Sequence, residues 1–382
     1  MDKKIFIGIA AMAALTLVSC SSDDLDSLSD NSSKNEAISF DGYLGRSAVA
    51  VNGTRGSVET AETLKKEGFG VFSKYNGSAS FPDFDNQKVT YLGSKWTYTP
   101  LKFWPANGEI NFLAYAPYNY AETNTTLTGS SISFEVYNTV ANQKDLLWAN
   151  TKGQITESLT STKEKVKIHF YHALSRLGYT VKLSGDYPSK DVTFTLKKIT
   201  LAGSPDGTTK AFYSKGTIDL SKTATNDNKE ELSKTNSETG LWKTEDTKQN
   251  FEWFSAGAQP VNITYVDPTD KTKKPVSNGK DYLFVIPQDF SSTADGADKL
   301  YVIVEYEINY KSGTPSTISN KVYKQITPKF LQGKAYMLNL TIGRPIEFDV
   351  DLTEGVGVEG WGTDEEINIG SGSNDNLWDG IE

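Results

Sequence analysis

The sequence predicts an all-β protein of the antiparallel sandwich type with very little helix. From residue 37 onward, short alternating or β-branched runs are separated by Gly, Asn, Asp, Ser and Pro, which is the pattern of sandwich folds. The 382 residues are 37% hydrophobic and 12% aromatic, so the chain can bury sizeable cores. This length predicts two domains of ordinary size.

Residues 1–20 are predicted to be a signal peptide. Lys3 and Lys4 precede an uncharged run, 5–18, which is too short to cross a bilayer comfortably. The run leads into "LVSC", which resembles the lipobox of bacterial lipoproteins, and Cys20 is the only cysteine of the chain. The resemblance implies that the preceding peptide is removed and that acyl chains on Cys20 anchor the protein in the outer membrane.

Residues 21–36, "SSDDLDSLSDNSSKNE", are predicted to be a flexible acidic tether, because they are rich in Ser and Asp and poor in apolar side chains. The acidic start of this segment resembles the surface-export signals of Bacteroidetes lipoproteins.

The predicted strands follow in order along the mature chain. They are 37–44, 68–75, 96–104, 109–117, 131–137, 166–173, 177–183, 192–203, 282–288, 299–310, 322–328 and 335–343. In the run 301–310, the even-numbered positions Val302, Val304 and Tyr306 continue into Ile308 and Tyr310, so one face is apolar. This strand is predicted to pack on a core through that face.

One short helix is predicted within 57–68, with Ser57 or Thr60 as its cap and Gly68 as its stop. The polar region 222–250 is predicted to be a surface loop or a hairpin excursion. The similar region 150–165 is predicted to be a junction, which divides the mature chain into an N-terminal domain, 37–162, a C-terminal domain, 163–345, and a tail, 346–382.

Composition and motifs predict no nucleic-acid partner, cofactor, metal or catalytic residue. A net charge of −9 and a pI near 5.0 disfavour binding to phosphate backbones. His169 and His172, three residues apart in a strand, face opposite sides and lack recognisable further ligands. The glycine pattern at 355–360 is followed by Trp361 and a polar segment rather than by the helix of a βαβ unit, so it is interpreted as a glycine-rich turn or extended segment and not as a dinucleotide site.

The tryptophans are the main candidates for a sugar-binding platform. Trp96, Trp104, Trp148 and Trp253 lie in apolar, strand-like runs, for which core packing is the favoured interpretation. Trp361 and Trp378 lie in the polar tail and are harder to assign to a core.

The order of the segments resembles the fimbrillin family of Bacteroidetes, the type V pilins. The segments that carry the resemblance are the lipobox, "ISFDGYLGRS", "GTRGS", "LKKEGFGVFSKY", "WTYTPLKFWPANGEINFLAYAPY", "QKDLLWA", "VKIHFYHALSRLGYTVKL", "YLFVIPQ" and "FLQGKAYMLNLTIG". The resemblance implies that the two domains are transthyretin-like Greek-key β-sandwiches.

The family also implies a maturation step in which an Arg-specific protease cuts behind the first strand. That strand is 37–44 here, with Ile38, Phe40 and Tyr43 as its large side chains. Arg46 and Arg55 are the only arginines between Cys20 and Arg176, so they are the candidate cleavage sites, and Arg55 is favoured because "GTRGSV" is more loop-like. The alternative is that both are ordinary surface arginines.

The resemblance further implies that subunits join when a C-terminal strand of one chain fills the groove that the first strand leaves in another. The candidate donor residues are Ile346, Phe348 and Val350, which alternate with polar residues, together with Ile367 and Ile369. The alternative is that 346–361 completes the sheet of its own chain and that the remainder is a frayed acidic terminus.

The predicted function is that of a structural subunit of a cell-surface fimbria for adhesion. Its expected partners are other pilin subunits, the outer membrane through the lipid of the precursor, the maturation protease, and a host or bacterial surface ligand. Two alternatives stay open, a surface glycan-binding lipoprotein and a fimbrial anchor or tip protein that does not polymerise.

Overall fold

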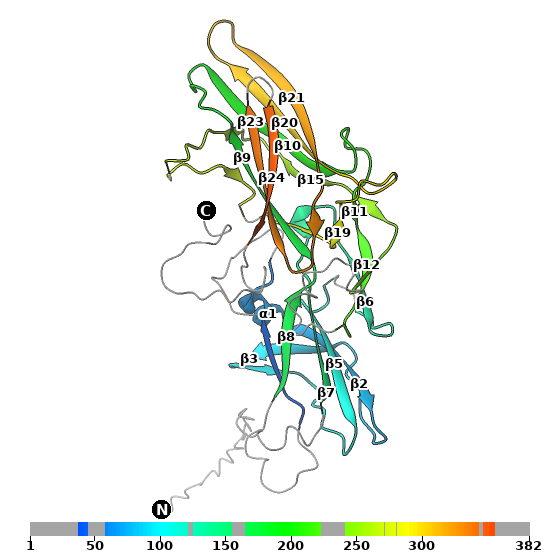
Figure 1. The fold of residues 1–382 in the computed structure, drawn as a ribbon. Helices are drawn as coiled ribbons and strands as arrows, with labels where there is room; N and C mark the ends of the chain where they lie inside the picture. The colour runs from blue at the N-terminus through cyan, green and yellow to red at the C-terminus, as the bar shows by residue number, and fades with distance from the viewer. Residues whose placement is uncertain are drawn as a thin grey trace, which may run out of the picture.

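The computed structural model describes residues 37–44, 58–120, 125–154, 165–222, 241–270, 272–279, 281–343 and 347–355. These residues form an elongated, nearly all-β molecule (Figure 1). Strands β2, β3, β5, β7 and β8 lie in the lower half of that view, which we call the N-lobe, and β9, β10, β20, β21, β23 and β24 lie in the upper half, the C-lobe. The predicted all-β fold is therefore confirmed, whereas the transthyretin-like topology stays a prediction.

One seven-stranded sheet forms the N-lobe. Its order is β1-β8-β7-β5-β2-β3-β4. The bounds are β1 Phe40–Leu44, β8 Val166–His172, β7 Leu147–Gln154, β5 Glu109–Ala116, β2 Phe69–Asn76, β3 Gln87–Leu92 and β4 Lys95–Thr97. β1 pairs with β8 in parallel, and the other neighbours are antiparallel.

The expected boundary between 162 and 163 is wrong, because β8 completes the first sheet rather than opening the second. Its C-terminal end pairs with β7, where Leu147 lies opposite His172, and the rest of β8 pairs with β1. Residues 150–154 belong to β7, so the region 150–165 connects two strands of one sheet and is not a domain junction. The chain passes to the C-lobe only after His172.

The single predicted helix is confirmed as α1, Ala61–Glu67. The side chain of Thr60 caps its N-terminus by accepting from the Thr63 amide, and the Thr63 hydroxyl accepts from the Thr60 amide in return. Gly68 ends the helix with a φ of 76°, a conformation that residues with a Cβ rarely adopt.

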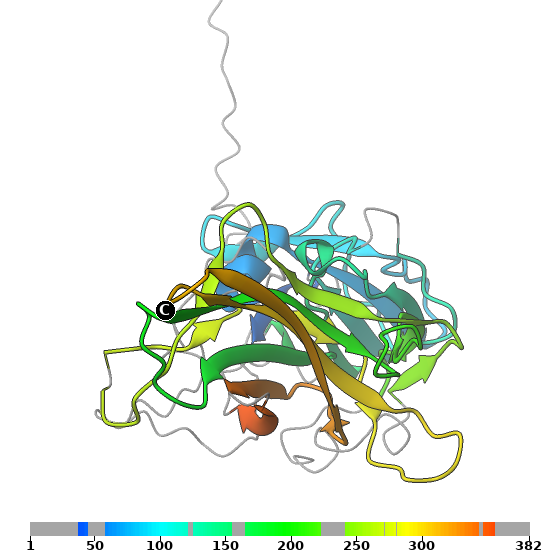
Figure 2. The same ribbon diagram turned by 90° about the horizontal axis from the view of Figure 1, so that it is seen from above.

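Two five-stranded sheets form most of the C-lobe. The first has the order β15-β10-β20-β21 with β16 also on β10, and the second has the order β17-β9-β23-β24 with β18 also on β9. Figure 2 looks along the length of the molecule and shows these sheets as separate layers. The bounds are β15 Phe251–Ser255, β10 Val192–Ala202, β20 Leu300–Tyr310, β21 Ser316–Ile326, β16 Val261–Ile263, β17 Val276–Ser277, β9 Ser175–Leu183, β23 Ala335–Gly343, β24 Glu347–Gly355 and β18 Leu283–Val285.

Three small sheets complete the fold. They are β13-β12-β6, β11-β14 and β19-β22. The bounds are β6 Ser131–Glu135, β12 Lys215–Asp219, β13 Trp242–Thr244, β11 Phe212–Tyr213, β14 Lys248–Gln249, β19 Gln288–Asp289 and β22 Lys329–Phe330, and a 3₁₀ turn, η2, spans Val140–Asn142. β12 and β13 pair in antiparallel fashion, and most of the region 222–250, for which a loop or hairpin was predicted, lies outside the described residues. β6, expected in the N-terminal domain, instead pairs with β12.

The core consists of two clusters of buried apolar side chains. One lies within the N-lobe and includes Phe40, Phe69 and Phe112, and the other extends from the inner end of the N-lobe through the C-lobe. The face predicted for 301–310 is confirmed, because Val302, Val304, Tyr306 and Ile308 are buried, whereas Tyr310 is half-buried.

Candidate functional site

The first strand lies where the two ends of the N-lobe sheet meet. β1 pairs along one edge with β8, from Phe40 opposite Val166 to Leu44 opposite Phe170. Its other edge faces β4 and the residues that follow it. There, the Ile38 amide donates to the Lys102 carbonyl at 2.8 Å. β1 thus closes the sheet on itself, although it comes from the start of the described chain.

Two aromatic side chains hold the outer edge of β1 by hydrogen bonds to its backbone. The hydroxyl of Tyr98 donates to the Ile38 carbonyl at 2.7 Å, and the indole nitrogen of Trp96 donates to the Gly42 carbonyl at 3.0 Å. Burial raises the pKa of Tyr98 to about 12, so the hydroxyl keeps its proton at physiological pH. Sequence reasoning placed Trp96 in the core but did not single out Tyr98, although their alternation in "WTYTP" puts both on one face.

Phe40 fills an aromatic pocket beneath β1. Its ring centroid lies 5.3 Å from that of Phe112, 5.5 Å from Phe84 and 5.6 Å from Tyr98, and the side chain is 1% exposed. Ile38, another predicted side chain of the strand, is buried to the same extent. Tyr43 is paired through its backbone with His169.

Loss of β1 would leave an apolar groove with unpaired backbone groups on both sides. The floor would be the Phe40 pocket, and the walls would be β8 and the segment that contains Tyr98 and Lys102. Unpaired backbone and an apolar floor are the features that a strand from another chain satisfies. The groove can therefore bind one extended segment with alternating apolar side chains.

The chain downstream of this strand is firmly anchored. The buried Glu59 amide donates to Oδ2 of Asp145 at 3.1 Å, and Nδ1 of His172 lies 2.7 Å from the same oxygen. The Thr63 hydroxyl donates to the Glu59 carboxylate at 2.9 Å. Burial, then the nearby charges of Glu67 and Asp145, raise the pKa of Glu59 well above its ordinary value. A cut between β1 and residue 58 would therefore separate β1 from an anchored helix.

The predicted processing residues lie outside the described residues: Cys20, Arg46 and Arg55. Of the two remaining arginines of the chain, Arg176 is 1% exposed, with its guanidinium carbon 4.7 Å from the ring centroid of Tyr282. Arg344 precedes Pro345, and trypsin-like proteases cut poorly before proline. Sequence and burial therefore leave Arg46 and Arg55 as the arginines best suited to cleavage.

The first part of the predicted donor segment is paired within its own chain. β24 runs antiparallel to β23, with Phe348 opposite Ile342 and Val350 opposite Leu340. This pairing agrees with the alternative that the segment completes its own sheet. Ile346, Ile367 and Ile369 lie outside the described residues, so the donor role stays a prediction.

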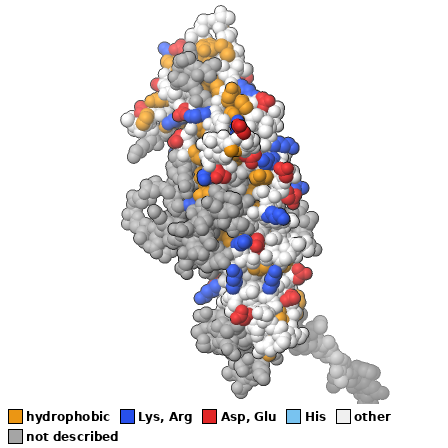
Figure 3. All heavy atoms as spheres, turned by 45° about the vertical axis from the view of Figure 1, so that its right-hand side comes forward, with side chains coloured by type: hydrophobic (Ala, Val, Ile, Leu, Met, Phe, Trp, Pro, Cys, Tyr) orange, Lys and Arg blue, Asp and Glu red, His pale blue; other side chains and the backbone are white. Residues whose placement is uncertain are grey.

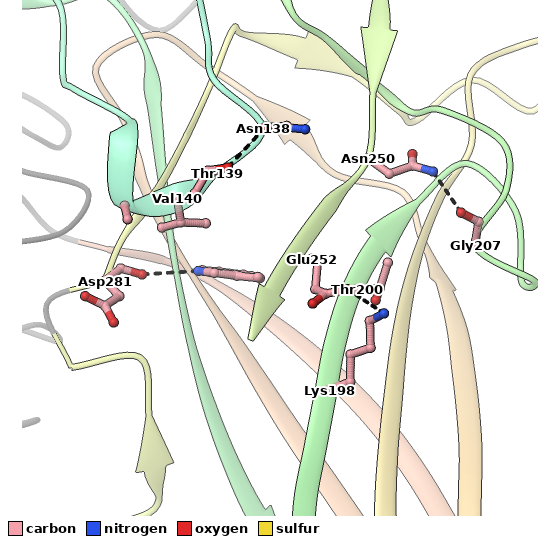
Figure 4. Close-up of a pocket in the computed structure, with 11 residues that line it drawn as sticks. Asn138, Thr139, Val140, Lys198, Thr200, Gly207, Asn250, Glu252 and Asp281 are labelled. Carbon is pink, nitrogen blue, oxygen red and sulfur yellow. Dashed lines mark hydrogen bonds and ion pairs between the residues drawn. The ribbon is translucent and has the colours of Figure 1, made fainter. Parts of the chain in front are cut away.

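An open cleft of about 560 Å³ lies on the C-lobe between η2 and strands β10 and β15 (Figure 4). It is lined by Asn138, Thr139, Val140, Ala141, Lys198, Thr200, Gly207, Asn250, Glu252, Trp253 and Asp281. Lys198 and Glu252 form an ion pair at 2.5 Å across its wall. Trp253 is 6% exposed and donates through its indole nitrogen to the Asp281 carbonyl, so it offers no open ring face for stacking on a sugar.

The other aromatic and histidine candidates that the structure describes are buried or stacked on neighbouring side chains. Trp96, Trp104 and Trp148 are buried, as expected, and Trp361 and Trp378 lie outside the described residues. His172 is buried against Asp145, whereas His169 stacks on Tyr171 with ring centroids 4.4 Å apart. Among the described residues, no three His, Cys, Asp or Glu side chains are grouped as metal ligands would be. Of the glycines in the 355–360 pattern, Gly355 ends β24 and the others are not described.

The described surface carries charges of both signs. Figure 3 shows Lys and Arg side chains interspersed with Asp and Glu along one face of the molecule. Within the part of the chain that the structure describes, no helix has the length and hydropathy needed to cross a bilayer.

These features define the class: an all-β structural protein whose distinctive site is an edge strand seated in an apolar groove. Residues 54–361 match the family model described as fimbrillin-like, and the chain belongs to that family. It is a family of fimbrial structural proteins, so the chain is a fimbrial protein of the cell surface and not an enzyme.

Two similar proteins agree with this assignment. The fimbrium subunit Fim1C of Phocaeicola vulgatus is 27% identical over 399 aligned residues, which cover 94% of this chain and 97% of that protein. The crystal structure of a fimbrial protein from Bacteroides vulgatus has a TM-score of 0.56 at 20% identity, over 83% of this chain and 99% of that one. At this identity, the crystal structure supports the fold alone.

Proposed function

We propose that the chain is the lipoprotein precursor of a fimbrial subunit that assembles by donor-strand exchange. Lipid on Cys20 delivers the precursor to the outer membrane. An Arg-specific protease cuts after Arg55 or Arg46, which separates β1 and the lipid from the rest of the chain. A C-terminal strand of another subunit then fills the groove, and the fibre serves adhesion to a host or bacterial surface ligand.

The seating of β1 carries this proposal. Residues 45–57 are the covalent link between β1 and the rest of the N-lobe. The other contacts of β1 described above are non-covalent, so a cut within 45–57 leaves the strand held by those contacts alone. Burial of Ile38 and Phe40 contributes about 1.5–3 kcal/mol each. A replacement strand of similar shape would regain a similar free energy of burial in the groove. Exchange is therefore favourable only when such a strand is available.

The test is cleavage of the purified full-length chain by an arginine-specific protease, with Cys20→Ser to keep the protein soluble. Mass spectrometry locates the cut, and gel filtration with electron microscopy reports release of β1 and polymer formation. Arg55→Lys, Arg46→Lys and the double variant preserve charge but remove the protease sites. We expect the double variant to resist cutting and to stay monomeric.

The proposal fails if the unchanged chain is not cut between β1 and residue 58 under conditions in which the protease is active. It also fails if the cut chain retains β1 and forms no polymer at any concentration. The alternative of glycan binding has no supporting observation among the described tryptophans, all of which are buried.

A further inference from the structure

The first strand and β24 have nearly the same sequence pattern. Residues 38–44 read "ISFDGYL" and residues 346–352 read "IEFDVDL", with Ile, Phe, Asp and Leu shared at the first, third, fourth and seventh positions. We propose that β24 is a copy of the first strand and replaces it in a second copy of this chain, with Phe348 in the pocket of Phe40. This inference rests on the proposed function and specifies its donor segment and register.

The two segments also agree in which face is apolar. Ile38 and Phe40 are buried beneath β1, while Ser39 and Asp41 are exposed. In the matching segment, 346, 348, 350 and 352 are Ile, Phe, Val and Leu, whereas 347, 349 and 351 are all acidic. Because side chains alternate across a strand, the proposed register puts every apolar residue of the donor into the groove.

The charges of the groove fit the same register. Asp41 lies opposite the exposed Lys167 across the β1–β8 ladder. Asp349 would occupy the place of Asp41 and so exchange its present partner, Lys324, for Lys167. An acidic residue therefore faces a lysine in both positions.

One groove-facing position differs in size between the two segments, and it requires a local change in the groove. Val350 would stand where Gly42 stands, and a Cβ at Gly42 would lie 2.8 Å from Cε1 of Phe69. The Phe69 ring must therefore move when β24 enters, and the valine side chain adds apolar surface to the contact.

The present position of β24 holds the donor until a groove is free. Among the described strands, β24 is at the end of its sheet and pairs with β23 alone, while Asp349 and Asp351 are exposed and Val350 is 8% exposed. In this position Val350 is buried against its own sheet, as it would be in the groove. The segment with Ile367 and Ile369 has no aromatic residue to match Phe40, so it is the poorer donor.

Cysteine pairs in the Cys20→Ser chain test the register. Lys167→Cys with Asp349→Cys places the two residues opposite each other if Asp349 takes the place of Asp41, and neighbouring strands are close enough for a disulfide. After cleavage and mild oxidation, we expect a ladder of disulfide-linked multimers on a non-reducing gel, and none before cleavage. Lys167→Cys with Asp351→Cys tests a register shifted by two residues, and Lys167→Cys with Asn368→Cys tests the later segment.

A second pair tests the holding position. Asn339→Cys and Asp351→Cys are opposite each other on β23 and β24, so their disulfide should abolish polymerisation until a reductant is added. Fibres that give the ladder only with Asn368→Cys or Asp351→Cys, or that form while this lock is oxidised, overturn the inference and leave the proposed function standing. Absence of both β1 release and fibres overturns the proposed function, and the inference with it.

Discussion

The hydroxyl of Tyr98 donates to the carbonyl oxygen of Ile38 at 2.7 Å, across the seam where the N-lobe sheet closes. On this outer edge, the first strand is held by the side chains of Tyr98 and Trp96 and by the backbone hydrogen bond from the Ile38 amide to Lys102, rather than by a continuous ladder. Such an edge can be vacated and refilled without breaking a ladder on that side, which suits a strand that is exchanged during assembly.

Tyr98→Phe should weaken the N-lobe by about 1 kcal/mol at pH 8, because one buried hydrogen bond is lost. The pKa of Tyr98 is raised to about 12, so its stabilising effect is complete below pH 10, the ordinary value, and is lost as the pH rises toward 12. The difference between the two proteins should therefore shrink above pH 10, by on the order of 1 kcal/mol per pH unit. Urea unfolding at pH 8, 10 and 11 measures it, and a difference that is constant across this range contradicts the assignment.

Phe40→Ala should destabilise the N-lobe by about 3–5 kcal/mol, because a fully buried ring is removed from an aromatic pocket. Ser39→Ala, at the exposed neighbouring position, is the control and should change stability by less than about 0.5 kcal/mol. Urea unfolding of the uncleaved chain supplies both values. Equal effects from the two variants would show that β1 is not seated as described.

Much of the fold follows from local sequence, and its misassigned parts depend on long-range pairing. The alternation in 301–310 and the cap at Thr60 are local signals, and both predicted the correct element. The placement of β8 depends on its pairing with β1, more than 120 residues earlier in the sequence, and no local signal carries that information.

The residues of the candidate site also separate into those that local sequence predicts and those that depend on long-range contacts. Ile38 and Phe40 could be predicted as the buried face of the first strand, because alternation alone identifies that face. Tyr98 and the contact between Glu59 and Asp145 could not, because each joins segments that only the folded sheet brings together. The pairing of β24 with its own β23 was one of two outcomes that the amphipathic pattern allowed equally.

Glu59→Gln should stabilise the protein at pH 8, and the gain should disappear toward pH 4.5. Burial and neighbouring carboxylates raise the pKa of Glu59, so the folded state favours the protonated form, and that advantage is lost as the pH rises through the raised pKa. Glutamine stays neutral and can still accept the hydrogen bond from Thr63. Urea unfolding at pH 4.5, 6 and 8 measures the difference, with Glu62→Gln on the exposed side of α1 as control. A gain that does not depend on pH contradicts the argument.

Gly42→Ala should destabilise the uncleaved chain by about 1–3 kcal/mol, because the new Cβ would lie 2.8 Å from a carbon of the buried Phe69 ring and 3.3 Å from Trp96. Gly257→Ala is the matched control, since its Cβ would meet nothing within 4 Å, and it should be neutral or slightly stabilising. Thermal or urea unfolding compares the two variants. The measured loss of stability also estimates the free energy needed to move the Phe69 ring when Val350 takes this position in the groove. If Gly42→Ala proves as harmless as Gly257→Ala, the ring moves freely and the valine fits without penalty, whereas a loss well above 3 kcal/mol would argue for a donor register in which Val350 does not meet Phe69.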